Sequence, residues 1–271
     1  MIIIPSAMKP IGIIGGTGFD SFVQNHRGSR KIGTSYGLPS SPVFSLDIGG
    51  RDVRFIYRHG LYPNKFPPQF VNYAANMKAL KDEGCESVIV TTAVGELMLP
   101  ENVGKIAVPH QLIDYTENRR RTLYEDRIIH VEFAKPYCDR LRQMIIAKAN
   151  KMNPNILDDG TIAVISGNRF STAAEHSRYK TDGCTLVGMT QCPESVFARE
   201  LEMCYAAIAI VTDYAINAQD PPGMRETTHE EVVEKFGANI GNVTHLLEEL
   251  LPEIPESRDC ICSTALSRAV H

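Results

Sequence analysis

The sequence lacks the features of a membrane protein and of a nucleic-acid-binding protein. None of its apolar runs reaches the length that spans a bilayer. A formal net charge of −4 over 271 residues leaves no excess of basic side chains for nucleic acid or for an anionic membrane surface. The start, MIIIPSAMKP, has neither the basic region nor the long apolar core of a signal peptide. We therefore expect a cytoplasmic protein with neither nucleic acid nor membrane as a partner.

The sequence also lacks a regular cysteine framework. Its seven cysteines are an odd number and are widely spread, which does not suit the paired bridges of a secreted protein. Cys260 and Cys262 are the exception, because one residue separates them. They are either two ordinary thiols or a disulfide or redox pair, as some cytosolic proteins of hot-living organisms carry.

What is present is the composition of a globular protein, with 43% hydrophobic and 22% charged residues. The length suffices for one large domain with a proper core. We find no repeat, low-complexity tract or long linker. The sequence therefore predicts one domain over 1–271, with an N-terminal extension at 1–10 and a C-terminal tail at 252–271.

Strand and helix patterns alternate along the chain. Short apolar or β-branched runs bounded by turn residues predict strands at 11–14, 43–48, 52–57, 87–92, 105–109, 161–166, 184–189 and 205–212. Apolar residues at helical spacing predict helices at 69–83, 136–151, 172–181, 193–202 and 228–250. Thr228 and Glu231 form a capping box at the start of the last helix. The alternation predicts an α/β fold, a single domain with a mixed β-sheet flanked by helices.

Polar clusters follow six of the predicted strands. Their sequences are GGTG, RHG, TAVG, SGNRFS, MT and TDY. Ligands of α/β proteins bind beyond the carboxyl ends of strands, so six such clusters can converge on one site. Each cluster by itself is more typical of a turn.

The glycine cluster after the first strand is not a nucleotide motif. No Gly-Lys-Ser/Thr follows it, and Ser21 stands where a dinucleotide fingerprint needs its third glycine. It is either a tight turn without a ligand or a place where backbone N–H groups approach an anion.

The side chains of the six clusters suit a small oxyanion. Arg58 can grip an oxyanion with two N–H groups, and His59 can donate or relay a proton. Hydroxyl and backbone donors complete a cradle for free phosphate that needs no metal: Gly16, Thr17, Thr92, Ala93 and Thr190. The alternative for Arg58 is an internal ion pair.

Two further residues point to a second ligand. Asp213 does not suit a phosphate, so it faces either a hydrogen-bond donor of another ligand or a backbone group that it caps. Phe170 either stacks on a flat ring or belongs to the core.

At these residues the sequence resembles the methylthioadenosine phosphorylase and trimeric purine nucleoside phosphorylase family. The resemblance covers roughly 11–250, and the order and spacing of its motifs carry it. They are IGIIGGTG, RHG, FPPQFVNYAANMKALKDEGC, VIVTTAVG, VPHQLIDYT, GNRFSTAAE, VGMTQCPESVFAREL and YAAIAIVTDY.

The resemblance implies a purine nucleoside phosphorylase-like fold and a pentosyl transfer in which phosphate attacks C1′ of a purine nucleoside. It implies that Asp213 shares a proton with purine N7, with Arg58 and His59 as its catalytic partners. It implies that phosphate is held by Gly16, Thr17, Arg58, His59, Thr92, Ala93 and Thr190. Phe170, Ser171, Met189 and His130 are implied contacts of the nucleoside, with His130 reaching the site of a neighbouring subunit of a homotrimer or hexamer. No cofactor is implied, since phosphate is a co-substrate.

The residues that distinguish the branches of this family disagree with one another. Ser171 and Asp213 match the aminopurine branch, which acts on methylthioadenosine. Ala215 replaces a second carboxylate of that branch, which weakens the preference for adenine by about 1 kcal/mol. His229 matches the 6-oxopurine branch, in which it contacts a ribose 5′-hydroxyl, and it shares a helical face with Val232 and Val233, so we expect it to point inward. Asn168 replaces the usual proline of GPR and frees a backbone N–H.

We therefore expect S-methyl-5′-thioadenosine as the substrate. The alternative within the family is adenosine, inosine or methylthioinosine. A hydrolase and a homologue that binds nucleoside without turnover are the alternatives outside this activity. A cradle for phosphate argues against hydrolysis.

Overall fold

The structure, a computed structural model, describes residues 8–16, 18–152, 156–221 and 227–269. Its strands are β1 (Ile11–Gly15), β2 (Gly28–Arg30), β3 (Val43–Ile48), β4 (Arg51–Tyr57), β5 (Gly60–Leu61), β6 (Asn64–Lys65), β7 (Ser87–Glu96), β8 (Ile106–Ala107), β9 (Gln111–Tyr115), β10 (Thr161–Ile165), β11 (Leu186–Gly188) and β12 (Cys204–Tyr214). Its α-helices are α1 (Asp20–Val23), α2 (Tyr73–Asp82), α3 (Asp139–Met152), α4 (Ala173–Thr181), α5 (Gln191–Glu200) and α6 (His229–Leu250).

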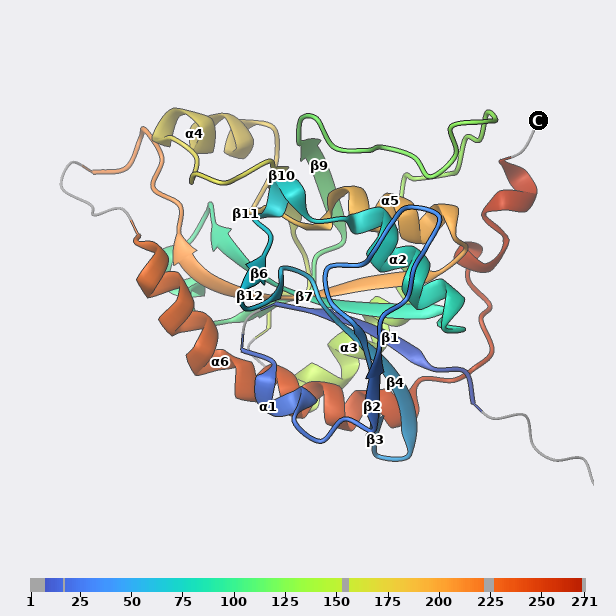
Figure 1. The fold of residues 1–271 in the computed structure, drawn as a ribbon. Coiled ribbons are helices and arrows are strands. Elements are labelled where there is room, and N and C mark those ends of the chain that lie inside the picture. The colour runs from blue at the N-terminus through green and yellow to red at the C-terminus, as the bar shows by residue number, and fades with distance from the viewer. Residues whose placement is uncertain (1–7, 17, 153–155, 222–226, 270–271) are drawn as a thin grey trace, which may run out of the picture.

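One mixed sheet organises the molecule around β7 (Figure 1). β1 lies between β4 and β7 and is parallel to both, and β12 is parallel to β7 on its other edge. β2 and β3 extend the sheet beyond β4 in antiparallel pairing. β11 joins the last residues of β7 in antiparallel pairing and leads to β10 and β9. The carboxyl ends of β1, β4, β7 and β12 therefore meet at one edge.

Helices cover both faces of this sheet (Figure 1). α1, α3 and α6 lie on one face, and α2 and α5 lie on the other. The fold class predicted from the sequence is confirmed, because a mixed sheet is flanked by helices.

The two central strands are buried on both faces. Cys204 to Val211 of β12 and Ser87 to Thr92 of β7 are all buried. A strand buried on both faces reads as a continuous apolar run. The VIVTT and YAAIAIV runs are of this kind, and the strands containing them were predicted, although β7 and β12 each extend further than expected.

The predicted helices are all present, with shifted ends. α6 begins directly after its N-cap residue Thr228, and the structure confirms the capping box that Thr228 forms with Glu231. The predicted strand at 105–109 is only the two-residue β8, while β9 was not predicted. β9 contains Gln111 and Asp114 and lies at the end of the sheet, so it lacks the apolar pattern of a central strand.

The tail after α6 packs back on the body as three short 3₁₀ turns, Leu251–Glu253, Ile261–Thr264 and Leu266–Arg268. Ile254, Cys262 and Ala265 are buried there. Within the described residues, no helix has both the length and the apolar character that crossing a bilayer requires.

Candidate active site

The carboxyl edge of the parallel strands gathers the predicted polar residues. Arg58 and His59 follow β4, Thr92 and Ala93 lie within β7, and Asp213 lies near the end of β12. Met189 and Thr190 follow β11, which is antiparallel to β7, so the chain reaches the site from the opposite direction. The Thr190 and Thr92 hydroxyls consequently lie 3.2 Å apart. The rule for parallel strands thus predicts most of the convergence but not the direction from which Thr190 enters.

Arg58 is a buried ion-pair partner of Glu194. Its Nε donates to Oε1 of Glu194 at 2.9 Å and its Nη2 to Oε2 at 3.0 Å, while Nη1 donates to the Thr91 carbonyl at 2.7 Å. Burial acts to lower the pKa of Arg58, but the Glu194 carboxylate more than offsets this and holds it above its ordinary value. These contacts use three of the five guanidinium N–H groups, which leaves two for an anion. The internal ion pair expected as an alternative is therefore present and is compatible with anion binding.

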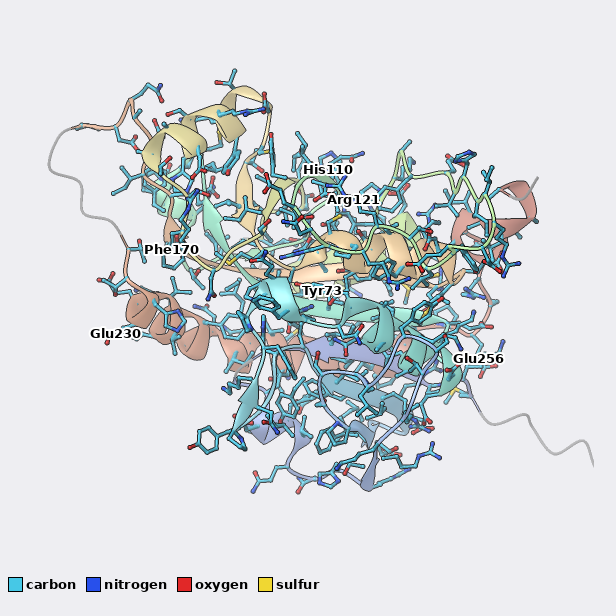
Figure 2. The ribbon with its side chains drawn as sticks, turned by 45° about the horizontal axis from the view of Figure 1, so that its top comes forward. Tyr73, His110, Arg121, Phe170, Glu230 and Glu256 are labelled. Atoms are coloured by element: carbon cyan, nitrogen blue, oxygen red, sulfur yellow. The ribbon has the colours of Figure 1, made fainter. Side chains whose placement is uncertain are left out.

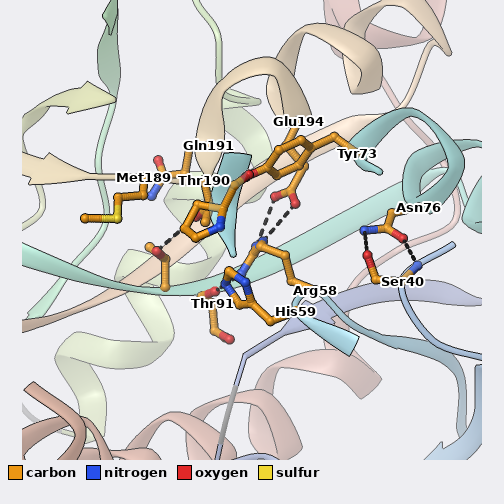
Figure 3. A network of polar contacts seen from close by, with 12 residues as sticks. Ser40, Arg58, His59, Tyr73, Asn76, Thr91, Met189, Thr190, Gln191 and Glu194 are labelled. Carbon is orange, nitrogen blue, oxygen red and sulfur yellow. Dashed lines mark hydrogen bonds and ion pairs between the residues drawn. The ribbon is translucent and has the colours of Figure 1, made fainter. Parts of the chain in front are cut away.

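Figure 3 shows His59 beside this ion pair and Thr190 and Met189 on the neighbouring side. The Thr92 and Thr190 side chains are both largely buried, and the Thr92 hydroxyl donates to the Ala93 carbonyl at 3.2 Å. A Cβ on Gly16 would meet no atom within 4 Å, so its backbone borders open space. Thr17 lies outside the described residues.

His59 is held neutral with a defined tautomer. Burial, and after it the charge of Arg58, lowers the pKa of His59. Its Nδ1 lies 2.8 Å from the Phe66 carbonyl, which only accepts, so Nδ1 carries the proton. Nε2 of the neutral ring is then an acceptor. Through Nε2, His59 can accept a hydrogen bond from a ligand hydroxyl.

Asp213 carries a partly buried carboxyl group. Burial raises its pKa, although a hydrogen bond from Thr212 Oγ1 at 2.7 Å opposes the shift. Its Oδ2 lies 3.0 Å from the position that a Cβ would take on Gly95, so the absence of a side chain at 95 leaves room for it. A carboxyl with a raised pKa can keep or share a proton where an ordinary aspartate is fully ionised.

The residues predicted to contact a nucleoside are more open. Phe170 is 47% exposed, and Figure 2 shows it on the same side of the molecule as Glu230 at the start of α6. The Ser171 hydroxyl lies 3.3 Å from the Tyr179 hydroxyl. Met189 is half-buried, with its Sδ 2.8 Å from the position of a Cβ on Gly167.

The expectation that His229 points inward is wrong for this chain. His229 is exposed, and Val233 of the same helical face is 47% exposed. Phe236 and Ile240 of α6 are partly buried against the core, and full burial begins only at Val243. Helical spacing identifies a common face but cannot show where along the helix the packing partner ends.

His130 is exposed in the segment between β9 and α3 and donates its backbone N–H to the Ala269 carbonyl at 3.1 Å. Figure 1 shows this segment beside the C-terminal tail, on the side opposite to α4 and the start of α6. The structure does not bring His130 to the site of its own chain.

Sequence reasoning missed two charged residues. One is Glu194, which also accepts from the Tyr205 hydroxyl at 2.9 Å and is fully buried. The other is Arg119, which donates to the carbonyls of Cys192, Ser166 and Met189 at 2.6, 3.0 and 2.8 Å and lies over the Tyr73 ring. Arg119 thereby ties together the ends of β10 and β11 and the start of α5. The signal for Glu194 was a carboxylate within QCPES, four residues after Thr190 and in a predicted helix.

Three comparisons with known proteins agree with this geometry. The family model of the phosphorylase superfamily matches residues 10–252. The chain is 42% identical to an S-methyl-5′-thioadenosine phosphorylase of Thermofilum pendens, over 96% of this chain and 98% of the relative. It is 37% identical to a 6-oxopurine nucleoside phosphorylase of Pyrococcus furiosus, over 97% and 99%. A solved methylthioadenosine phosphorylase of Schistosoma mansoni, in complex with adenine, superposes with a TM-score of 0.85 at 32% identity, over 92% and 93%. The family resemblance found in the motifs is confirmed.

Proposed function

Since the chain belongs to the phosphorylase superfamily, we propose that it cleaves the N-glycosidic bond of a purine nucleoside with inorganic phosphate. The preferred nucleoside is S-methyl-5′-thioadenosine, and the products are the free purine and 5-methylthioribose 1-phosphate.

The observation that carries this proposal is the pairing of an anion site with a partly buried carboxyl whose pKa is raised. Two free N–H groups of Arg58 and the adjoining hydroxyls of Thr92 and Thr190 suit phosphate. Gly16, Thr17 and Ala93 complete the cradle with backbone and hydroxyl donors. Asp213, at the neighbouring strand end, has a raised pKa and suits a nitrogen that gains negative charge. The same site therefore holds the attacking phosphate and stabilises the leaving purine.

Each residue then has a role in the transfer. Phosphate attacks C1′ while the bond to the purine breaks, and positive charge develops on the sugar. The phosphate held by Arg58 stabilises that charge, and Nε2 of His59 accepts a hydrogen bond from a phosphate hydroxyl. Asp213 shares its proton with purine N7 and stabilises the leaving base. Positioning and fixed charges supply the catalysis, so no cofactor or metal is required.

The substrate follows from the residues around the base and the 5′ group. Phe170 stacks on the purine, Met189 lies under the ribose, and Ser171 and Asp213 fit a 6-aminopurine. The relatives include enzymes named for methylthioadenosine, two named for 6-oxopurine nucleosides and one named for methylthioinosine.

The second candidate is a phosphorylase of adenosine, inosine or methylthioinosine. The buried Ala215 leaves no second carboxylate for an exocyclic amine. His229 at the start of α6 supplies a group for a 5′-hydroxyl. Ala215 and His229 favour the second candidate.

We also propose that the chain acts as a homotrimer, or a hexamer built from trimers, in the cytoplasm. Within one chain the nucleoside side of the site is exposed, and His130 is exposed away from that site. His130 of a neighbouring subunit can therefore complete the nucleoside side. Light scattering of the purified protein tests the trimer, and His130→Ala should raise KM for the nucleoside while leaving the oligomer intact.

The experiment is purine release from methylthioadenosine, adenosine, inosine and methylthioinosine, each with and without phosphate. The proposal expects the highest kcat/KM with methylthioadenosine and a requirement for phosphate. A preference for a 5′-hydroxyl or a 6-oxopurine supports the second candidate. Equal release without phosphate indicates a hydrolase, and binding without release indicates a homologue without catalysis.

A further inference from the structure

We propose a tetrathiolate site for a zinc-class divalent ion, formed by Cys138, Cys204, Cys260 and Cys262. The sequence left Cys260 and Cys262 as ordinary thiols or as a disulfide or redox pair. The structure adds two thiols from distant parts of the chain. All seven cysteines are free thiols, and the four Sγ atoms of this cluster lie within 4.8 Å of one another.

The spacing of the sulfurs fits tetrahedral coordination. Zinc–sulfur bonds of about 2.3 Å place the sulfurs of a tetrahedron about 3.8 Å apart. The observed separations bracket this value, with 3.3 Å between the Sγ atoms of Cys204 and Cys260 and an upper bound of 4.8 Å. Four sulfurs leave no open position, so this is a structural site, unlike a catalytic one.

The fold brings these cysteines together from three elements. Cys138 immediately precedes α3, and its backbone N–H donates to the Tyr205 carbonyl at 2.8 Å, which sets it beside Cys204 at the start of β12. The C-terminal tail contains the other two ligands, Cys260 and Cys262. It is anchored near the same strand by Arg258 Nη1, which donates to the Glu202 carbonyl at 2.6 Å, and by the Leu266 N–H, which donates to the Glu202 carboxylate at 3.1 Å.

A neighbouring charge suits the ligated state. Four thiolates and one divalent ion carry a net charge of −2. The Nη2 atom of Arg140 lies 4.0 Å from the Cys204 Sγ. The Nε and Nη1 atoms of Arg140 are buried without a hydrogen-bond acceptor among the described residues, and the nearest Asp259 oxygen is 4.0 Å from Nε. Burying the charged Arg140 guanidinium without acceptors costs free energy if the nearby thiols are neutral. Thiolates around a metal ion would balance its charge.

The site would fasten the tail to the body. The tail carries Ala269, whose carbonyl accepts from the N–H of His130. Metal binding therefore also steadies the segment that presents His130. This consequence for His130 rests on the proposed trimer, but the metal site does not.

The test uses the full chain, produced in zinc-supplemented medium and purified under reducing conditions without a chelator. We expect one zinc ion per chain by elemental analysis. Exchange with Co²⁺ should give thiolate-to-metal charge-transfer bands and the visible bands of tetrahedral cobalt. Cys262→Ala should lose stoichiometric metal, whereas Cys184→Ala, a buried cysteine of a different core cluster, should keep it.

A second variant keeps the test independent of folding. Arg140→Gln retains all four ligands, and removal of such an outer partner should weaken Co²⁺ affinity by about 10- to 100-fold. The proposal is overturned if the reduced wild-type chain takes up neither zinc nor cobalt. It is also overturned if mass analysis without reductant finds these cysteines joined as disulfides and metal-free, or if Cys262→Ala binds as wild type does. Purine release is not the readout, so this result and that of the proposed function stand apart.

Discussion

The two sides of the candidate active site are built differently. On the phosphate side, Arg58, Glu194, Thr92 and Thr190 are all buried and linked to partners within the chain. On the nucleoside side, Phe170 and His229 are exposed, and no residue of α6 before Val243 is fully buried. One chain therefore forms the anion site by itself, while the nucleoside side depends on the ligand and on a neighbouring subunit. Substitutions on the phosphate side should therefore lower the stability of the fold, whereas those on the nucleoside side should mainly weaken substrate binding.

The largest expected effect is at Glu194. Glu194→Gln leaves the buried Arg58 charge without its carboxylate, which should lower the free energy of unfolding by about 3–5 kcal/mol. Purine release should also be lost, because Arg58 would no longer be held for phosphate. Denaturant unfolding measures the stability. Lys135→Ala, which removes the exposed ion pair with Asp139, is the control and should unfold as wild type does.

If Glu194→Gln were as stable as the control variant, the phosphate side would not be the preorganised part of the site.

The next effect is at Asp213, at the boundary between the two sides. Asp213→Asn should lower kcat by about 10²–10⁴-fold, because the proton shared with N7 is lost. It should also move base preference toward 6-oxopurines. Steady-state kinetics with methylthioadenosine and methylthioinosine measures both. Asp126→Asn at an exposed position is the control. A lower rate with unchanged base preference contradicts a role for Asp213 in choosing the base.

The same variant should change the pH dependence. Burial raises the pKa of Asp213, so the folded protein keeps this proton at pH values where the unfolded chain has lost it. The free energy of unfolding due to this group is therefore largest below its ordinary pKa and falls as pH rises through the folded pKa. Asp213→Asn should remove that fall from the stability profile. An unchanged profile would mean that the carboxyl is not shielded.

Arg119 links the two sides, and its effect should be smaller. Arg119→Lys keeps the charge but cannot reach three carbonyls at once, since an ammonium lacks the planar fork of a guanidinium. Loss of one such bond, about 1.5–3 kcal/mol, should lower kcat/KM by about 10- to 150-fold. The change should appear mainly in KM for the nucleoside, because Met189 and the Ser166 end of β10 would shift. Arg120→Lys is the matched control, and an effect on phosphate KM alone would contradict the assignment.

The smallest effect is at Phe170, on the open side. Phe170→Ala should leave stability within about 0.5 kcal/mol, since the ring is half exposed. Loss of stacking, about 1–3 kcal/mol per base, should raise the nucleoside KM by about 5- to 100-fold. Phe70→Ala, which removes another exposed ring, is the control for nonspecific effects. A marked loss of stability in Phe170→Ala would place that ring in the core after all.

The sequence predicted the sheet, the helices and the strand-end clusters, because local patterns determine them. The runs of β7 and β12 and the capping box of Thr228 are examples. It did not predict Glu194 or Arg119, since their partners lie far away in sequence and nothing local marks a buried charge. It misplaced His229 for the same reason, because where α6 stops packing depends on the extent of the sheet.

The most direct test of the account is the fate of phosphate. Methylthioadenosine and phosphate are incubated with the protein, and the products are followed by ³¹P NMR together with purine release. We predict a sugar 1-phosphate formed in equal amount with the purine, and no purine when phosphate is omitted. Purine released with free methylthioribose and no phosphate ester would contradict the assignment of Arg58, Thr92 and Thr190 as the site of the attacking phosphate.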